Sequence, residues 1–427
     1  MHAAESTRTS SRFWRLVSLG DRAGGAWATP VDDAALDASA TGVSIDTRTL
    51  RPGEVYVAIR GERFDGHDFA ARAVEAGASA VVVERAVVGM GGAPVLRVDS
   101  TVEALQRWAG GWRDELAAGG CRVIAVGGSN GKTTTRGLIH HVLTRAGIAG
   151  TQSPKSFNNH LGVPLTLLAA DAGHGFVVAE VGTNHVGEVD ALARLIRPDA
   201  AVITSIGREH LEHFGSLDAV RREEFSLLDH VQAGGPAWTP DAPPPPYAGP
   251  LALPGEHNRL NAAAAAAVAR WLGVDDATIE AALAAAEPPP GRGRVKRLGE
   301  ITVIDDSYNA NPDSMLAALR VLADHAPARR VAVLGDMFEL GGHGPAGHRE
   351  VLAAARAAAD RVVVVGESFA DAAAGADDVQ SHRDPDAAAI AAIADALEAG
   401  DVVLLKGSRG MAMERILAAL TRQAPSP

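Results

Sequence analysis

The stretch from Cys121 to Thr135 constrains the fold of this chain more than any other. It reads CRVIAVGGSNGKTTT: an apolar run, a cluster of glycines, and a Lys-Thr pair that opens a helical pattern. A strand, a glycine-rich loop and a helix N-terminus in this order form a phosphate cradle, because glycines let backbone amides turn inward and the helix dipole favours an anion. The alternative interpretation is a glycine-rich turn that happens to precede a lysine.

The spacing within this loop narrows the class of protein. A common P-loop carries a glycine where Val126 stands here, so the pattern is the shorter GxxGKT, from Gly128 to Thr133. We expect Lys132 to bridge the β- and γ-phosphates of a nucleotide and the Thr133 hydroxyl to hold Mg²⁺. The short loop disfavours a P-loop transport ATPase.

Length and charge bound the architecture. The chain has 427 residues, which predicts two or three domains, and its hydrophobic content of 47% includes much alanine, which is typical of a helix-rich α/β protein. A net charge of −12 with scattered basic residues argues against a nucleic-acid partner. With Cys121 as the single cysteine, neither a disulfide framework nor a cysteine-based zinc site can form within the chain. No apolar run has signal-peptide or membrane-spanning length, so we expect a cytoplasmic protein without stable membrane insertion.

Residues 1–105 read as a small α/β domain. Its expected strands are Val43–Arg48, Val55–Ile59 and Ala80–Val83, with a helix over Phe69–Ala76. The polar stretch Gly61–Phe69 reads as an ordinary surface loop. Asp46, Thr47 and Arg48 could hold a phosphate, although a lone Asp-x-Arg is a weak signal.

Residues 106–290 form the expected nucleotide domain, and two of its strands are followed by or end in polar groups that could meet a ligand. Glu180 closes the apolar run Phe176–Val181, where a carboxylate needs a partner or a metal ion. His210 follows the next strand, Ala201–Ile206. Ligands of doubly wound sheets lie beyond the carboxyl ends of the strands, so Glu180 is a Mg²⁺ candidate and His210 lies where ligands gather. The alternatives are a salt-bridged core glutamate and a capping or surface histidine.

Two pairs of asparagines in this domain have equally open interpretations. Asn158 and Asn159 precede a Gly-Val-Pro turn and either aim their amides at a ligand or cap the next helix. Asn258 and Asn261 share a face at the start of an alanine-rich helix, where they either read a purine edge or cap the helix.

Residues 291–427 alternate strands with long helices, which predicts a third, Rossmann-like domain with a mostly parallel sheet. The Pro/Gly-rich segment Glu287–Arg294 reads as the linker to it, and its arginines could clamp a transferring phosphoryl group. The expected strands are Ile301–Ile304, Val331–Leu334, Arg361–Val365 and Val402–Leu405. Polar loops follow them at Asp305–Ser314, Gly335–Gly341 and Lys406–Met411, and by geometry these are ligand loops or helix caps.

The chain resembles the Mur ligases, the ATP-dependent amide-forming enzymes of peptidoglycan precursor synthesis. The resemblance runs along nearly the whole chain, in GERFDGHDF, GSNGKTTT, FNNHLGVPLTLL, EVGTNHVGE, HLEHFGS, GEHNRLNAAAA, DDSYNANPDSM, VLGDMFELG with His348, and KGSRGMAME. The last three strings are typical of the branch that adds D-alanyl-D-alanine to UDP-N-acetylmuramoyl-tripeptide. The DNPR signature of the branch that adds diaminopimelate is missing.

The resemblance implies three domains that bind the UDP end of the substrate, ATP and the incoming dipeptide, in that order. Its implied catalytic residues are Lys132, Arg292 (with Arg294 as the alternative) and His210. The implied ATP-binding residues are Gly128, Ser129, Asn130, Gly131, Lys132, Thr133, Thr134, Asn258, Asn261 and Asp336. The implied substrate-binding residues are Ser44, Asp46, Thr47, Arg48, Asn158, Asn159, Tyr308 and Asn311. The implied metal ligands are Thr133, Glu180, His210 and Glu224.

One departure from the family pattern concerns the second metal. The family carries a carbamylated lysine after its FGS string, and the segment Leu217–Phe225 here contains no lysine. Counting from FGS places Glu224 at that position, with Glu223 one residue off. Either a glutamate supplies the metal-binding carboxylate directly, or RREE is an exposed helical charge run.

The implied reaction starts when a carboxylate of the UDP-linked tripeptide attacks the γ-phosphate of ATP. The amine of D-alanyl-D-alanine then displaces phosphate from the acyl phosphate. No general base stands out, although His185 and His348 are possible. We expect a monomer with ATP, Mg²⁺ and these small molecules as its partners. The alternatives are a relative with another acceptor, such as a folylpolyglutamate synthase, and an ATP-binding partner subunit that has lost ligase chemistry.

Overall fold

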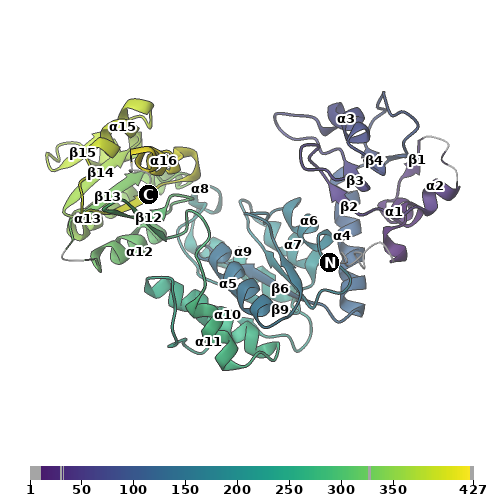
Figure 1. The fold of residues 1–427 in the computed structure, drawn as a ribbon, viewed down its shortest axis with the longest axis horizontal. Coiled ribbons are helices and arrows are strands. Elements are labelled where there is room, and N and C mark those ends of the chain that lie inside the picture. The colour runs from purple at the N-terminus through teal and green to yellow at the C-terminus, as the bar shows by residue number, and fades with distance from the viewer. Residues whose placement is uncertain (1–10, 29–30, 32, 326–327, 424–427) are drawn as a thin grey trace.

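Three sheets follow one another along the chain, and Figure 1 shows their units in a row, with the central one between the other two. The structure is a computed structural model that describes residues 11–423 apart from 29–30, 32 and 326–327. Within these described residues, no helix is both long and apolar enough to cross a membrane. The mixed α/β class and the three-unit architecture expected from the sequence are confirmed.

The first sheet has the strand order β1-β5-β4-β3-β2, parallel except for β1. Its elements are α1 (Leu16–Ala23), β1 (Ala26–Trp27), α2 (Asp33–Asp37), β2 (Gly42–Ser44), β3 (Glu54–Val57), α3 (Ala70–Glu75), β4 (Ala80–Val83) and β5 (Val95–Arg97). Strand β2 is shorter than expected, because Asp46 closes a turn by accepting from the Arg48 amide at 2.9 Å. The expected surface loop Gly61–Phe69 is wrong in its second half, where Gly66–Phe69 is a 3₁₀ turn around buried His67.

The central sheet is fully parallel, in the order β10-β9-β6-β8-β7. Its strands are β6 (Arg122–Gly127), β7 (Gly150–Gln152), β8 (Phe176–Glu180), β9 (Ala200–Ile203) and β10 (Ala237–Trp238). Its helices are α4 (Thr101–Ala118), α5 (Lys132–Arg145), α6 (Gly162–Leu168), α7 (Glu188–Ile196), α8 (Leu211–Phe214), α9 (Leu217–Phe225), α10 (Glu256–Trp271) and α11 (Asp276–Ala284).

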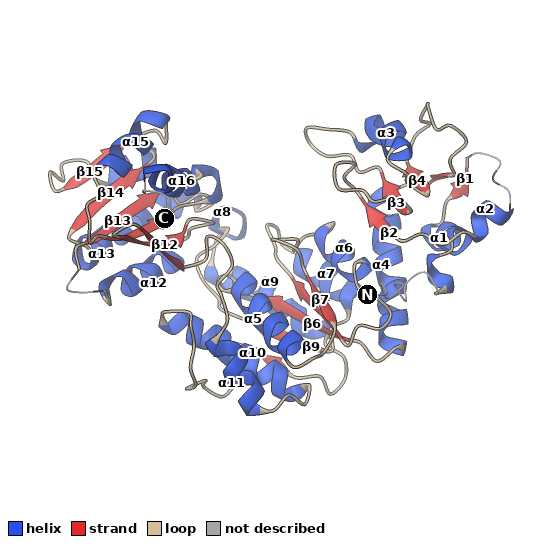
Figure 2. Cartoon of the chain, viewed as in Figure 1, coloured by secondary structure: helices blue, strands red, loops and turns tan. Residues whose placement is uncertain are grey.

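Alternate residues of each central strand enter different cores, as the strand period requires. Val123 and Ala125 pack with α4, α6 and α7 on one face. Ile124 and Val126 pack with α5, α10 and α11 on the other. Both faces are therefore covered by helices, as Figure 2 shows, which suits a parallel sheet whose strands are continuously apolar.

The third sheet runs β11-β12-β16-β13-β14-β15, parallel except for the edge hairpin of β11 and β12. Its strands are β11 (Arg294–Leu298), β12 (Ile301–Asp306), β13 (Arg330–Gly335), β14 (Arg361–Val365), β15 (Val379–His382) and β16 (Val402–Lys406). Helices α12 (Pro312–Ala323), α13 (Gly344–Ala358) and α14 (Glu367–Ala372) cover one face. Helices α15 (Ala387–Asp395) and α16 (Glu414–Gln423) cover the other. The sequence did not predict the edge strands β11 and β15, because polar residues interrupt the apolar pattern in both.

Helix α4 joins the first unit to the central one, and residue 105 lies inside it. Its Trp108 indole donates to the Leu19 carbonyl at 2.8 Å, while its Trp112 indole donates to the Ala170 carbonyl at 3.0 Å. Buried Arg113 donates to the Ile196 carbonyl and to Asp199, both at 2.8 Å.

We expect Arg113→Leu to lower the melting temperature by at least about 5 °C, because removing one partner of a buried ion pair leaves the other charge without that partner. The matched control is Arg194→Leu, which removes an exposed i,i+4 pair with Asp190 and should change the melting temperature by less than about 2 °C. Thermal unfolding followed by circular dichroism measures both. Equal melting temperatures for the two variants would contradict a structural role for Arg113.

Candidate active site

The glycine loop between β6 and α5 has the conformation that the sequence predicts. Gly128 and Gly131 lie in the left-handed region, with φ of 106° and 91°. A Cβ on Gly128 would stand 2.5 Å from Thr204 Oγ1, so the backbone there approaches β9 more closely than any side chain allows. The predicted strand, loop and helix are therefore present, and the alternative of a chance glycine turn is wrong.

The first amides of the loop are already hydrogen-bonded within the protein. The Gly128 amide donates to Glu224 Oε2 at 2.6 Å. The Ser129 and Asn130 amides donate to the carbonyl and hydroxyl of Ser205, each at 2.8 Å. Helix α5 begins at Lys132 after Gly131, and the first-turn amides of a helix have no partner inside it. The amides left to bind a phosphate are therefore those at the N-terminus of α5, and the Gly128 amide is not among them.

Lys132 lies folded back on this loop among carboxylates. Its ammonium donates to the Gly128 carbonyl and to the Ser129 carbonyl, and lies 3.5 Å from Glu209 Oε1. Burial opposes its charge, but Glu209, Glu224 and Glu180 outweigh burial and raise the pKa of Lys132. The side chain therefore carries its positive charge at neutral pH, as binding a phosphate requires.

Glu180 lies at the end of β8 and meets Thr133, as a shared metal site would need. Its Oε2 accepts from Thr133 Oγ1 at 3.0 Å and from Arg136 Nε at 3.2 Å, and its Oε1 accepts from Asn158 Nδ2 at 3.2 Å. A hydroxyl and a carboxylate are the oxygen ligands that Mg²⁺ prefers, so Thr133 and Glu180 fit this ion. The sequence did not predict a role for Arg136, because its position on α5 does not indicate Glu180 as its partner.

Among the described residues, neither His210 nor Glu224 makes a hydrogen bond or ion pair with Thr133 or Glu180, although His210 lines one cavity with them. His210 Nδ1 lies 2.6 Å from Glu339 Oε2. Burial opposes its charge, but the contacts with Glu339 and Glu209 raise the pKa of His210. Across residues 11–423, masked positions apart, no three His, Cys, Asp or Glu side chains gather closely enough to hold a metal ion.

Glu223 and Glu224 are both buried, so the interpretation of RREE as an exposed charge run is wrong for these two residues. Glu223 accepts from the Gly187 and Val189 amides at 2.7 and 2.8 Å and so caps α7. Glu224 braces the Gly128 amide through Oε2, and its buried Oε1 has no partner among the described residues. Burial raises the pKa of Glu224 to about 7.

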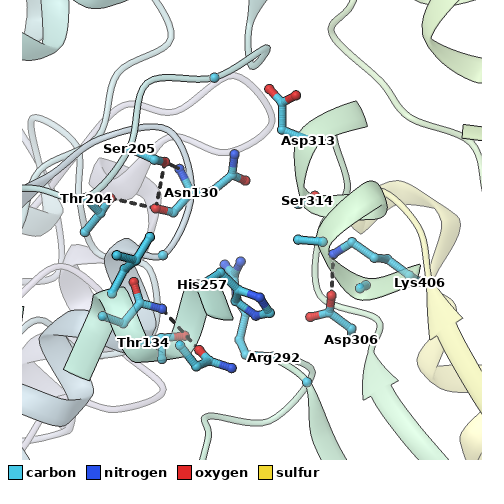
Figure 3. Close-up of a pocket in the computed structure, with 18 of the residues that line it drawn as sticks. Asn130, Thr134, Thr204, Ser205, His257, Arg292, Asp306, Asp313, Ser314 and Lys406 are labelled. Atoms are coloured by element: carbon cyan, nitrogen blue, oxygen red, sulfur yellow. Dashed lines mark hydrogen bonds and ion pairs between the residues drawn. The ribbon is translucent and has the colours of Figure 1, made fainter. Parts of the chain in front are cut away.

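Two adjoining cavities open between the central and third sheets, of about 230 and 250 Å³. Figure 3 shows the first, with Asn130, Thr204 and Ser205 on one wall and Asp313, Ser314 and Lys406 on the other. Asn258 and Asn261 line it and bond to each other at 3.1 Å, and Thr135 Oγ1 donates to Asn261 at 3.1 Å. The second is lined by Lys132, Thr133, Asn158, Asn159, Glu180, Glu209, His210, Arg292, Tyr308, Asn311, Lys406 and Arg409, among others.

The two arginines of the linker, Arg292 and Arg294, have different surroundings. Arg292 lines both cavities and stacks on the Tyr308 ring, with its Cζ 4.2 Å from the centroid. Arg294 belongs to β11 and donates to Glu287 at 2.7 Å instead. The geometry therefore favours Arg292 as the arginine that reaches a ligand.

Lys406 is the main residue that the sequence analysis did not single out. It lines both cavities, and its ammonium donates to Asp306 at 2.6 Å and to the Asn309 carbonyl at 2.9 Å. Burial lowers its pKa despite that pair. The signal was available, because Lys406 opens one of the polar loops expected to carry ligands.

Other expected site residues lie elsewhere. Asp336 lines neither cavity and accepts from the Ser368 and Phe369 amides at 3.0 and 2.8 Å, which caps α14. His348 Nε2 accepts from the Met337 amide at 3.0 Å, and neither His348 nor His185 lines a cavity. The group Ser44, Asp46, Thr47 and Arg48 lies on the first unit, where Arg48 pairs with Asp46 at 2.6 Å. Asn159 differs from these residues, because it lines the second cavity and also accepts from the Gly162 amide at 2.9 Å at the start of α6.

The buried carboxyl of Glu224 predicts a measurable pH dependence. Its pKa in the folded protein lies above the ordinary value of 4.5, so the folded state binds the proton more tightly than the unfolded state. The group therefore costs stability increasingly from about pH 4.5 to about pH 7, and by a constant amount above that. Glu224→Gln keeps an oxygen for the Gly128 amide but cannot ionise.

We expect the melting temperature of Glu224→Gln minus that of the unchanged protein to grow as the pH rises from about 5 to about 7 and then to level off. Differential scanning fluorimetry across this range, without nucleotide, measures it. A difference that stays flat over the whole range would contradict the raised pKa.

Known proteins are similar to this chain over most of its length. The descriptions "Mur ligase family, catalytic domain", "Mur ligase middle domain" and "Mur ligase, glutamate ligase domain" match residues 39–113, 126–243 and 291–409. The UDP-N-acetylmuramoyl-tripeptide--D-alanyl-D-alanine ligase of Escherichia coli (strain K12) is 36% identical over 91% of this chain and 94% of its own. The protein of the same name from Mycobacterium tuberculosis (strain ATCC 25618 / H37Rv) is 33% identical over 88% and 91%.

Solved structures agree with the sequence relatives. MurF from Acinetobacter baumannii superposes with a TM-score of 0.83 at 29% identity, over 96% of this chain and 99% of its own. MurF ligase from Thermotoga maritima, in complex with ADP, superposes with a TM-score of 0.77 at 26% identity, over 92% and 99%. From its three matched segments and these full-length relatives, the chain belongs to the Mur ligase family.

Proposed function

We propose that this protein is an ATP-dependent ligase that joins D-alanyl-D-alanine to UDP-N-acetylmuramoyl-tripeptide in peptidoglycan precursor synthesis. The observation that carries the proposal is the meeting of Lys132, Arg292 and Lys406 at two adjoining cavities between the sheets. The choice of dipeptide acceptor rests on the names of relatives that align over about 90% of the chain.

ATP is the nucleotide we assign, since the related MurF from Thermotoga maritima was solved with ADP. We place its phosphates at the first turn of α5, where free amides and Lys132 favour an anion. Asn258 and Asn261, which line the adjoining 230 Å³ cavity, then border the nucleoside. Thr133 and Glu180 would hold Mg²⁺, which supplies positive charge to the phosphates when it is bound.

The chemical difficulty is that two anions, a carboxylate and a γ-phosphate, must approach each other. Three basic side chains around the cavities reduce this repulsion, namely Lys132, Arg292 and Lys406. Tyr308 holds Arg292 by stacking, and its hydroxyl lies 2.5 Å from Ser156 Oγ on the central unit. Attack of the carboxylate on the γ-phosphate forms an acyl phosphate, and the dipeptide amine then displaces phosphate from it. The walls of the cavities keep competing water from the acyl phosphate.

The first unit, at the opposite end of the central sheet from the third, is the proposed site for the UDP end of the substrate. Ser44 ends β2, Asp46, Thr47 and Arg48 follow it, and Arg48 is largely exposed. We propose domains at residues 1–105, 106–290 and 291–427, with α4 as the shared element at the first boundary. We also propose that the protein works as a monomer, in the cytoplasm.

The direct test supplies the protein with ATP, Mg²⁺ and UDP-N-acetylmuramoyl-tripeptide, with either D-alanyl-D-alanine or single amino acids. We expect phosphate release and a nucleotide-linked pentapeptide, detected by mass spectrometry, with the dipeptide alone. Release that does not depend on the dipeptide would reject the acceptor, and no release under any condition would reject the ligase.

Lys132→Ala tests the phosphate loop. We expect at least about a 100-fold loss of turnover, because the variant removes positive charge where negative charge concentrates in the transition state. Its melting temperature without nucleotide serves as the control for folding. Near-normal turnover in a folded variant would show that the loop does not bind the reacting phosphates.

A further inference from the structure

One arginine joins the central unit to two helices of the third unit. Arg208 follows β9, and its guanidinium donates to Asp313 on α12, from Nε at 3.0 Å and from Nη2 at 2.7 Å. It also donates to Glu350 on α13, from Nη1 at 2.5 Å and from Nη2 at 3.2 Å. The Arg208 amide donates to Asp313 Oδ2 at 2.7 Å. Both carboxylates lie more than a hundred residues away along the chain.

The other side-chain links across this boundary differ from it in kind. Asn311 Nδ2 donates to Asn130 Oδ1 at 2.8 Å, and the hydroxyls of Ser156 and Tyr308 are 2.5 Å apart. Both of these links are neutral, and the His210–Glu339 contact is an ion pair only while the imidazole is protonated. Arg208 has a guanidinium that stays charged at every working pH, in the planar form that binds carboxylates in two-point contacts.

The position of this cluster connects it to the nucleotide cavity. Asp313 lines the 230 Å³ cavity from the third unit, and Gly207 and Asn130 line it from the central unit. Figure 3 shows Asp313 on the wall opposite Asn130 and Ser205. A Cβ on Gly207 would stand 2.8 Å from Asp313 Oδ2, so the two walls are close where Arg208 joins them.

We propose that Arg208 is a positioning residue that holds α12 and α13 against the loop after β9 and so sets the width of the nucleotide cavity. Three charges from three elements meet there, and each carboxylate is half-exposed, so the link can open and close reversibly. High salt weakens it by screening. The inference rests on the proposed function for its ADP and kinetic readouts, whereas the scattering readout does not depend on it.

The experiment uses the full chain with Arg208→Gln, Glu350→Arg, Arg208→Glu, and the double variant Arg208→Glu with Glu350→Arg. Small-angle X-ray scattering without ligand measures the separation of the units, and titration with ADP measures nucleotide affinity. We expect Arg208→Gln to increase the radius of gyration and to weaken ADP binding by roughly fivefold to tenfold. Its KM for ATP should rise more than its kcat falls. The double variant should bind ADP more tightly than Arg208→Glu alone, since the two exchanged side chains again carry opposite charges and can pair. Its recovery should be partial, because Asp313 then faces a glutamate instead of a guanidinium.

Arg356→Gln is the matched control, because Arg356 pairs with Asp378 at 2.8 Å within the third unit. It should leave scattering and ADP affinity unchanged. Raising NaCl from about 0.1 to about 0.5 M should expand the unchanged protein but not Arg208→Gln.

Two results would overturn the proposal: unchanged scattering and ADP affinity in Arg208→Gln, or single-variant losses that simply add in the double variant. If a variant at Arg208 fails to fold, Glu350→Gln replaces it, since Glu350 is an exposed residue of α13. An unchanged protein without ligase activity would reject the proposed function, whereas scattering would still decide the role of Arg208.

Discussion

The hydrogen bond from the Gly128 amide to Glu224 fixes the geometry on which the nucleotide site depends. It attaches the start of the glycine loop to α9, and Ser205 at the end of β9 attaches the next two amides. A loop held from outside at three amides presents the N-terminus of α5 in one orientation. A buried carboxylate with one unpartnered oxygen lowers the free energy of unfolding. The site therefore retains a destabilising group that holds the loop in place.

The second constraint is the arrangement of strand ends. Most strands within the central sheet, and most within the third sheet, run parallel to their neighbours. The carboxyl ends of these strands face the two cavities, so residues after β6, β8, β9, β12 and β16 come together. Side chains from distant segments then share one electrostatic environment. Lys132 stays charged because carboxylates surround it, whereas buried Lys406, with one carboxylate partner, has a lowered pKa. Two lysines of one site thus differ through their neighbours alone.

Much of this could be predicted from the sequence, because the signals are local. The glycine spacing, the apolar strands and the carboxylate that ends β8 each lie within a few residues, and the family resemblance covers the chain. Pairings across long separations could not be predicted. Nothing near Arg208 indicates Asp313 or Glu350, and nothing near Glu224 indicates the Gly128 amide. The position of Glu224, counted from FGS, suggested a metal ligand, but the fold directs its carboxylate to the loop. Nothing near Asp336, which the resemblance implied as an ATP-binding residue, indicates that it accepts from the Ser368 and Phe369 amides and caps α14.

The central claim is that the cavities bring a carboxylate of the tripeptide to the γ-phosphate of ATP so that an acyl phosphate forms. Tripeptide substrate labelled with ¹⁸O in its terminal carboxylate tests this most directly. After one turnover with D-alanyl-D-alanine, mass spectrometry of the released phosphate should show one ¹⁸O atom, because the carboxylate oxygen that attacks phosphorus leaves with the phosphate. Phosphate without ¹⁸O, alongside normal peptide product, would contradict the account.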